Sequence, residues 1–449
     1  MGDNKLKKNI TLIPALALVV GTVIGSGVFF KPKAVFTATG APGLGMVAWI
    51  LGGIITIAAG LTAAELAAAI PKTGGAVTYL KETYGDLWGF LFGWAQTCIY
   101  FPGTIAALGI IFGTQAAALL GLSSKTVTPI AIGIVLFLTL FNILGGSKAS
   151  ASLQTMATAC KLIPLFLIIA AGFLKGDGGT ANFLPLVASE QSVATGLGSA
   201  LIACMFAYNG WINVGAIAGE MKNSGKDLPK AIVGGLVIVM AVYVSINAAY
   251  LFVLPASKLA VSATPAADVA VKIFGAMGGK IIISGILISI FGTLNGYIFT
   301  VPRVPYSLAL ENKLPASKWL SKLHPKTSSP INTTLLIVSM AMIYIFTGSF
   351  DQLTNLAIFV MWMFYVLTFI GVFVLRRKQP ALNRPYKVPL YPVVPMIAIL
   401  GGSYIIINTL ITQPKNSVFG ILITLMGVPV YLARRSKFKP IKEFDKRAA

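Results

Sequence analysis

The chain has 449 residues, of which 56% are hydrophobic and only 11% are charged, and its mean hydropathy is +0.84. Soluble domains of this length do not have such a composition, so we expect an all-α protein that crosses a membrane many times. The net charge of +22 would suit nucleic-acid binding, but the charged residues lie between apolar stretches, and the single histidine and three cysteines form no metal-binding pattern.

The first apolar stretch, residues 11–34, has the sequence Gly21-Thr22-Val23-Ile24-Gly25-Ser26-Gly27 at its centre. The stretch is long enough to cross a bilayer, but glycine and serine weaken the interior of a helix. Lipid cannot satisfy the N–H and C=O groups that a broken helix exposes, so those groups must face a cavity or a polar ligand. We therefore predict a ligand-binding break in this span. The alternative is a glycine–serine face that packs between helices.

Twelve membrane spans are predicted along the chain. They cover residues 11–34, 43–69, 86–119, 127–146, 152–174, 195–219, 230–254, 272–306, 331–347, 353–375, 390–411 and 416–434. With this topology, twenty-six of the 35 Lys and Arg residues fall on one face of the membrane and eight on the other. The positive-inside rule then places both termini in the cytoplasm. The proline-rich segment 379–395 is predicted to be a non-helical connection.

The sixth span is predicted to be broken as well, at Ala207-Tyr208-Asn209-Gly210-Trp211. Asn-Gly is a strong turn signal and is unusual at the centre of a membrane helix. Paired interruptions five spans apart indicate a transporter built from inverted repeats, with its site at the repeat interface. We expect one transporter domain over residues 1–440. It would comprise repeat one at about 11–174, repeat two at about 195–375 and accessory spans at about 390–434, followed by a basic cytoplasmic tail at 441–449.

Several motifs resemble those of the amino acid–polyamine–organocation superfamily. The likeness is greatest to its L-type amino acid transporter branch and to the bacterial serine/threonine and alanine–serine–cysteine exchangers. The motifs are residues 21–29, Ala64-Glu65-Leu66, Pro71-Lys72-Thr73-Gly74-Gly75, Phe206 to Trp211, Gly219 to Asn223 and Ser289 to Gly296. The resemblance implies a five-plus-five inverted-repeat core, unwound in spans one and six, that works by alternating access. One departure is Asn209, because many members carry Asp at that position.

A zwitterionic amino acid bound inside the membrane needs fixed dipoles for its carboxylate and its ammonium group. Helix N-termini bind anions, so the N–H groups of Ser26 and Gly27 are the expected carboxylate site. Free carbonyls at the ends of the first halves of both broken spans suit the ammonium group, and glycines at the break favour small substrates. The predicted substrate-binding residues are Val23, Ile24, Gly25, Ser26, Gly27, Phe206, Ala207, Asn209 and Tyr243.

Three aromatic residues are further candidates. Tyr208 and Trp211 flank the second break and are predicted to gate the site as an extracellular lid; ordinary packing or an interfacial position is the alternative. Tyr243 has a hydroxyl that needs a partner when buried. The resemblance places it near the substrate, and a bond to a neighbouring helix is the other possibility.

Lys161 lies inside a predicted span and is the one basic residue that the topology assigns to neither face of the membrane. An intramembrane lysine indicates function by default, although its side chain could instead reach the head groups. The resemblance implies that Lys161 supplies the positive charge that a sodium ion supplies in sodium-coupled members of the fold. Its expected acceptors are a carbonyl near Gly21 and the hydroxyl of Ser289, in preference to Ser284. Glu65 and Glu220 are candidates for a gate salt bridge or a proton site, or are solvated charges at helix ends.

These observations predict a secondary transporter and not an enzyme. We expect sodium-independent exchange of small neutral L-amino acids (Ala, Ser, Cys or Thr) across the plasma membrane. The alternative is a proton-coupled amino-acid symporter in which Lys161 or Glu65 titrates. No cofactor, metal or nucleic acid is expected. Cys98, Cys160 and Cys204 all lie in apolar spans, so no cysteine could link to an ancillary subunit outside the cell, and no such subunit is expected.

Overall fold

The computed structural model describes residues 11–70, 75–188, 192–212, 221–325, 327 and 329–437, without the side chains of 146–152, 154–160 and 224. This part of the chain is helical and contains no strand. Among the described residues, eight stretches are long and apolar enough to cross a membrane, and α1 (Leu12–Val23) with α2 (Gly27–Thr39) adds a ninth that is bent by 49°. The predicted membrane-spanning, all-α architecture is therefore confirmed.

The helices follow the predicted spans closely. Spans two and three correspond to α3 (Pro42–Ala69) and to α5 (Asp86–Ala95) with α6 (Phe101–Leu120); later spans are α8 (Val193–Ala207), α9 (Ser224–Val253), α11 (Pro265–Thr300), α14 (Ile331–Thr347), α15 (Phe350–Lys378), α16 (Val393–Thr412) and α17 (Pro414–Leu425) with α18 (Gly427–Arg434). The short helices α4 (Ala76–Tyr84), α10 (Ala256–Val261), α12 (Arg303–Leu310) and α13 (Ser317–Leu320) lie between them. No helix is present between Lys378 and Val393, as the prolines predicted.

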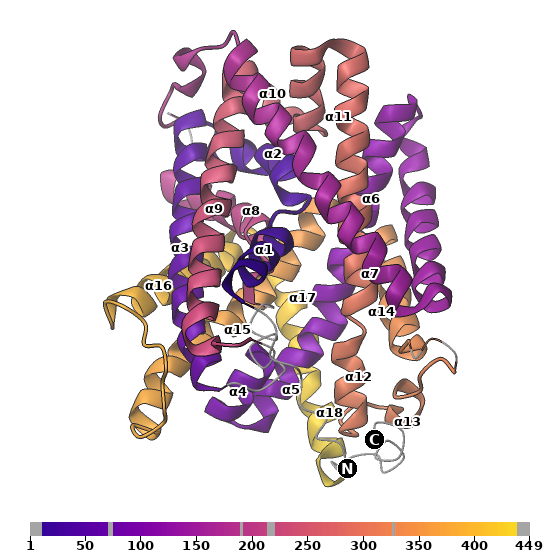
Figure 1. Cartoon of the computed structure of the whole chain (residues 1–449), viewed down its shortest axis with the longest axis vertical. Coiled ribbons are helices and arrows are strands. Elements are labelled where there is room, and N and C mark those ends of the chain that lie inside the picture. Colours follow the sequence, from indigo (N-terminus) through magenta and orange to yellow (C-terminus); the bar gives the residue numbers. More distant parts are fainter. Residues whose placement is uncertain are drawn as a thin grey trace.

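The fourth and fifth predicted spans form a single helix, α7 (Val127–Lys175), because the expected connection at 147–151 is helical. Residues 148–161 are mostly good helix formers, which explains the difference. The helix nevertheless bends. Asn142 donates a 2.9 Å hydrogen bond to Asn295, and Pro164 packs against Gly285, only ten residues earlier in α11. A straight helix would separate Asn142 from Pro164 by about 33 Å. Figure 1 shows the two arms of α7 diverging from a turn at the right-hand edge of the bundle, below its middle.

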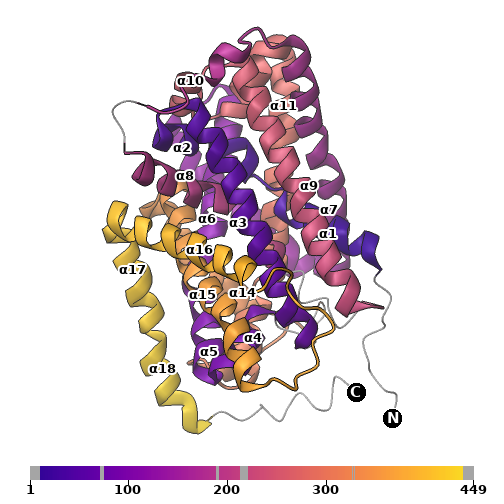
Figure 2. The ribbon, with the colours of Figure 1, turned by 90° about the vertical axis from the view of Figure 1, so that its left-hand side faces the viewer.

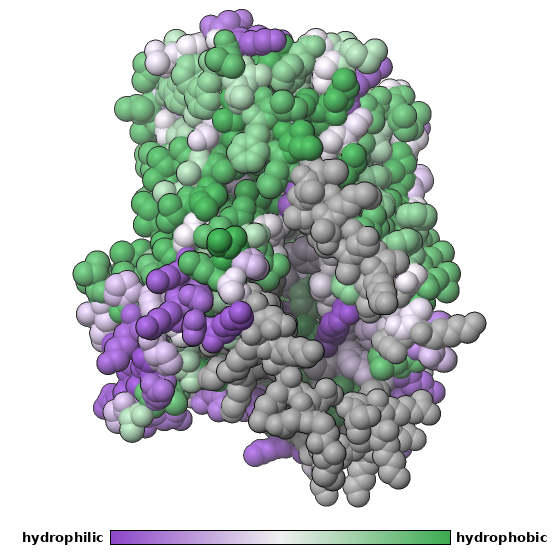
Figure 3. Space-filling model, viewed as in Figure 1, coloured by the Kyte–Doolittle hydropathy of each residue, from purple (hydrophilic) through white to green (hydrophobic). Residues whose placement is uncertain are grey.

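The two ends of the bundle differ in charge. One end, at the bottom of Figures 1 and 2, carries α4, α18 and the 379–392 segment; we call it the basic end, because it holds Lys313, Lys318, Arg376, Arg384 and Arg434. The opposite end, with α10 and the turn Thr180–Phe183, we call the far end. Figure 3 shows apolar side chains over the upper and middle parts of the molecule and hydrophilic ones gathered toward the basic end. This apolar surface is what a lipid-embedded bundle requires.

A short π-helical segment, Gln96–Tyr100, joins α5 to α6. It was not predicted. Such a turn contains one extra residue and therefore changes which face of the span each later side chain occupies. Before it, Trp94 donates a 2.9 Å hydrogen bond to the carbonyl of Ile423 on α17. At its end, the hydroxyl of Tyr100 lies 3.0 Å from that of Tyr297 on α11. The π segment thus turns Tyr100 toward the centre of the bundle.

Candidate functional site

The first break lies where the sequence predicted it. The α1 helix ends at Val23, and Ile24 turns the chain with φ −69° and ψ 99°, before α2 begins at Gly27. The first N–H groups of a helix have no acceptor within that helix. Those at the start of α2 border a cavity that Gly25, Ser26 and Gly27 help to line. The local geometry is that of an anion site at a helix N-terminus.

The second break begins where α8 ends, at Ala207, and the chain turns through Gly210 with φ 113°. The two breaks touch each other directly. A Cβ atom on Gly27 would lie 2.7 Å from the Cα atom of Ala207, and one on Gly210 would lie 3.0 Å from the carbonyl oxygen of Thr22. Glycine is required at both positions because the backbones approach so closely.

Tyr243, on α9, connects the two breaks. Its hydroxyl lies 2.9 Å from the carbonyl oxygen of Val23 and 2.9 Å from that of Ala207, the last residues of α1 and α8. A hydroxyl has one proton, so it donates to one of these carbonyls at a time. The ring is fully buried against Trp49 and Tyr208. These are the carbonyls expected to receive the substrate's ammonium group, and Tyr243 therefore holds the proposed ammonium site together.

A small, partly open cavity lies between the two breaks. Of the predicted substrate residues, Val23, Gly25, Ser26, Gly27, Phe206, Ala207 and Asn209 line it. Sequence reasoning missed Thr22, Thr104, Leu108, Thr293 and Tyr297, which complete the lining. Ile24 and Tyr243 are buried outside the lining. Among the described residues, the walls combine hydroxyl groups with backbone dipoles, and no charged side chain lines them, which suits a small neutral zwitterion.

The two predicted gating residues are packed in the core and do not line the cavity. Tyr208 donates a 2.9 Å hydrogen bond to the carbonyl of Trp49, and the ring of Trp211 lies 6.1 Å from that of Tyr365. Both are about 98–99% buried. The aromatic side chain of this segment that does border the cavity is Phe206. A gating role for Tyr208 and Trp211 stays a prediction.

Asn209 takes part in a neutral polar cluster on one wall of the cavity. Its side-chain amide donates to the hydroxyl of Tyr100, which lies 3.0 Å from that of Tyr297, and its carbonyl oxygen lies 3.5 Å from the hydroxyl of Tyr365. These tyrosines come from the π-helical segment, α11 and α15. The cluster holds Asn209 of the second break in place without a charge.

Lys161 reaches the end of α1. Its ammonium group donates a hydrogen bond to the carbonyl of Gly21, and the side chain is 5% exposed. The expected contact with Ser289 is not made in this conformation, because the buried Ser289 hydroxyl has no partner among the described residues. Ser284 donates to its own helix, 2.9 Å from the carbonyl of Lys280. Lys161 therefore binds the end of α1, and a contact with Ser289 stays a prediction.

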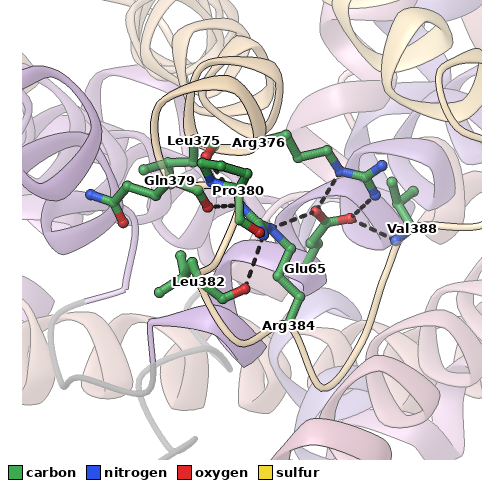
Figure 4. Close-up of polar contacts among 8 residues, drawn as sticks. All are labelled: Glu65, Leu375, Arg376, Gln379, Pro380, Leu382, Arg384 and Val388. Atoms are coloured by element: carbon green, nitrogen blue, oxygen red, sulfur yellow. Dashed lines mark hydrogen bonds and ion pairs between the residues drawn. The ribbon is translucent and has the colours of Figure 1, made fainter.

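Glu65 is the centre of an ion cluster at the basic end (Figure 4). Arg376 binds its carboxylate with two hydrogen bonds of 2.8 and 2.7 Å, the backbone N–H of Val388 adds one of 2.7 Å, and Arg384 lies 3.7 Å away. Arg384 also donates to the carbonyls of Leu375, Gln379, Pro380 and Leu382. The cluster fastens α3, α15 and the 379–392 segment together. Glu220 and Lys72 lie outside the described residues.

Known proteins resemble the chain over nearly its whole length. Residues 10–432 match the family model described as Amino acid permease. The Serine/threonine exchanger SteT of Bacillus subtilis (strain 168) is 44% identical over 97% of this chain and 98% of that protein. The Cystine/glutamate transporter of Homo sapiens and the Asc-type amino acid transporter 1 of Mus musculus are each 31% identical, over 95% and 98% of this chain and 85% and 84% of those proteins. The resemblance drawn from the motifs is confirmed: the chain belongs to the amino acid permease family of the amino acid–polyamine–organocation superfamily, whose members are transporters and not enzymes.

Proposed function

We propose that this protein exchanges small neutral L-amino acids across the plasma membrane by alternating access, without sodium. The observation that carries the proposal is the bond from the Lys161 ammonium group to the carbonyl of Gly21. Unwound carbonyls of this kind coordinate the coupling cation in transporters with broken helices. A lysine that already supplies a positive charge there leaves no need for sodium.

The cavity supports a small zwitterion as the substrate. The N–H groups of Ser26 and Gly27 would bind its carboxylate, and the carbonyls of Val23 and Ala207 would bind its ammonium group, in exchange with the Tyr243 hydroxyl. The hydroxyl-bearing walls suit Ser and Thr, and Ala and Cys are of similar size. The names of the relatives, a serine/threonine exchanger and an Asc-type transporter, agree with this class.

The conformation is open on the side of α1 and closed on the side of α2. Thr22, at the end of α1, is exposed where it lines the cavity, whereas Phe29 and Phe30 at the start of α2 are buried. We assign the basic end to the cytoplasm by the positive-inside rule, so the site faces inward and both termini are cytoplasmic. The chain is proposed to work without an ancillary subunit.

The experiment is uptake of radiolabelled L-serine into proteoliposomes that are empty or preloaded with unlabelled L-serine. We expect uptake only into preloaded vesicles, at equal rates in sodium and choline media. A sodium requirement would contradict the role given to Lys161. Uptake into empty vesicles that follows an imposed pH gradient would establish proton symport instead. Gly25→Leu, which fills the cavity, is the matched inactive control, and competition by unlabelled amino acids would identify the preferred substrate.

A further inference from the structure

Lys31 is a fully buried lysine in the first turns of α2, and it has no role in the site described so far. Its ammonium group lies 2.8 Å from a carboxylate oxygen of Asp351 and 2.6 Å from the hydroxyl of Thr354, both on α15. It also lies 5.1 Å from the centre of the Phe206 ring and 4.6 Å from that of Phe350. A buried charge needs such partners, because desolvation otherwise makes it very unfavourable.

The group sits on the closed side of the cavity. Phe206 lines the cavity, and its ring packs edge-on to that of Phe350, at 5.7 Å between ring centres. Phe30 meets Phe350 in the same way at 6.2 Å. Substrate that enters from the far end must pass these rings, so the contact between α2 and α15 has to open.

The two helices hold this contact differently. The start of α15 is fixed by a capping box, in which Ser349 and Gln352 exchange hydrogen bonds of 3.1 and 3.3 Å. The α2 helix instead begins at the break, where no side chain caps it. The Asp351 side chain is 43% exposed, whereas that of Lys31 is 0% exposed. Opening would therefore hydrate the lysine far more than the aspartate.

We propose that Lys31 and Asp351 form the lock that keeps the far end closed, and that the lock opens when the site turns toward the far end. Phe206 connects the lock to the substrate, because the same side chain borders the cavity and lies beneath the ammonium group. Lys31 is a positioning residue and does not contact the substrate. The inference rests on alternating access in the proposed function, but not on the identity of the amino acid.

The lock predicts opposite effects for its two partners. Asp351→Asn leaves an ammonium group buried without its counter-charge in the closed state only, so the equilibrium shifts toward the far-end-open state. Lys31→Met removes both the ion pair and the cost of desolvating the ammonium group. The apolar side chain packs against Phe206 and Phe350, so the closed state becomes more stable relative to the open one. Thr354 keeps its own bond to the carbonyl of Phe350, 2.8 Å away, and is not orphaned by either change.

The test measures the apparent affinity for L-serine from each side of oriented proteoliposomes. Because apparent affinity scales with the fraction of the competent state, Asp351→Asn should lower KM at the far end and raise it at the basic end. Lys31→Met should do the reverse, each changing the ratio by about five- to tenfold. The double variant should follow Lys31→Met. Asp177→Asn is the matched control, because it breaks an exposed pair with Lys272, 2.6 Å long, near the same end.

A second measurement needs no substrate and separates the lock from the proposed function. Hydrogen exchange of the full chain in lipid nanodiscs should speed up over residues 28–36 in Asp351→Asn and slow down in Lys31→Met, with Asp177→Asn unchanged. Shifts of both variants in one direction, or shifts no larger than the control's, would overturn the lock. Exchange results as expected with no serine transport would leave the lock standing and remove the proposed function.

Discussion

Gly25 and Gly27, two residues apart in the first break, should respond differently to the same added methyl group. A Cβ atom on Gly27 would lie 2.7 Å from the Cα atom, 3.0 Å from the Cβ atom and 3.3 Å from the nitrogen of Ala207. On Gly25 its nearest neighbours would be a methyl carbon of Thr293 and the carbonyl oxygen of Val23, both 3.9 Å away. Gly27→Ala therefore pushes against the backbone of α8, whereas Gly25→Ala only enters the cavity.

The magnitudes follow from this difference. Overpacking typically costs about 1–3 kcal/mol, and replacing Gly by Ala in a helix returns up to about 1 kcal/mol. Gly27→Ala should lose about 1–2 kcal/mol of stability and most of its transport, because it displaces Ala207. Gly25→Ala should unfold like the wild type but bind substrate about tenfold more weakly, since a methyl group takes space beside the carboxylate site and tenfold corresponds to about 1.4 kcal/mol.

The assay is thermal unfolding in detergent, combined with serine-uptake kinetics in proteoliposomes for both variants. Equal destabilisation of Gly25→Ala and Gly27→Ala would contradict the assignment of one glycine to the ligand and the other to helix contact. Wild-type stability and uptake in Gly27→Ala would show that α2 and α8 do not meet as closely as described.

Three further substitutions test the contacts around the site. Lys161→Ala leaves the carbonyl of Gly21 unpaired, which costs about 1–3 kcal/mol. The variant should lose most turnover, and its KM should change more on one side of oriented proteoliposomes than on the other. An unchanged ratio of the two KM values would mean that the lysine is an interfacial anchor. Tyr243→Phe removes the proton shared by two buried carbonyls and should raise KM for serine, so a wild-type KM in uptake assays would contradict its bridging role. Glu65→Gln breaks a buried ion cluster, which should cost about 3–5 kcal/mol of stability and lower the melting temperature with little change in KM. An unaltered melting temperature would refute the role of Glu65 in holding α3, α15 and the 379–392 segment together.

The breaks could be predicted because their signals are local. Glycines near residue 25 and the Asn209-Gly210 pair disfavour a helix whatever surrounds them, and the structure interrupts α1–α2 and α8 at those positions. The limits of most spans were also predictable from hydropathy. The connection expected inside α7 was not, because Lys148, Ala149 and Ala151 are good helix formers and keep the chain helical.

The rest of the site depends on contacts that no local pattern encodes. Thr104 and Thr293 resemble any threonine in an apolar span, and only the packing of α6 and α11 turns them toward the cavity. The partner of Glu65 is Arg376, 311 residues later in the chain. Lys31 carried no local signal that set it apart from other lysines near span ends, and its burial follows from the position of α15.

The π-helical segment has a consequence for how this protein tolerates insertions and deletions. Removing one residue from Gln96–Tyr100 would restore regular α-helix and rotate α5 by about 100° relative to α6. Trp94 would then swing away from Ile423, or Tyr100 would leave the cluster at Asn209. The length of the third span is therefore fixed by the two partners on either side of the π turn.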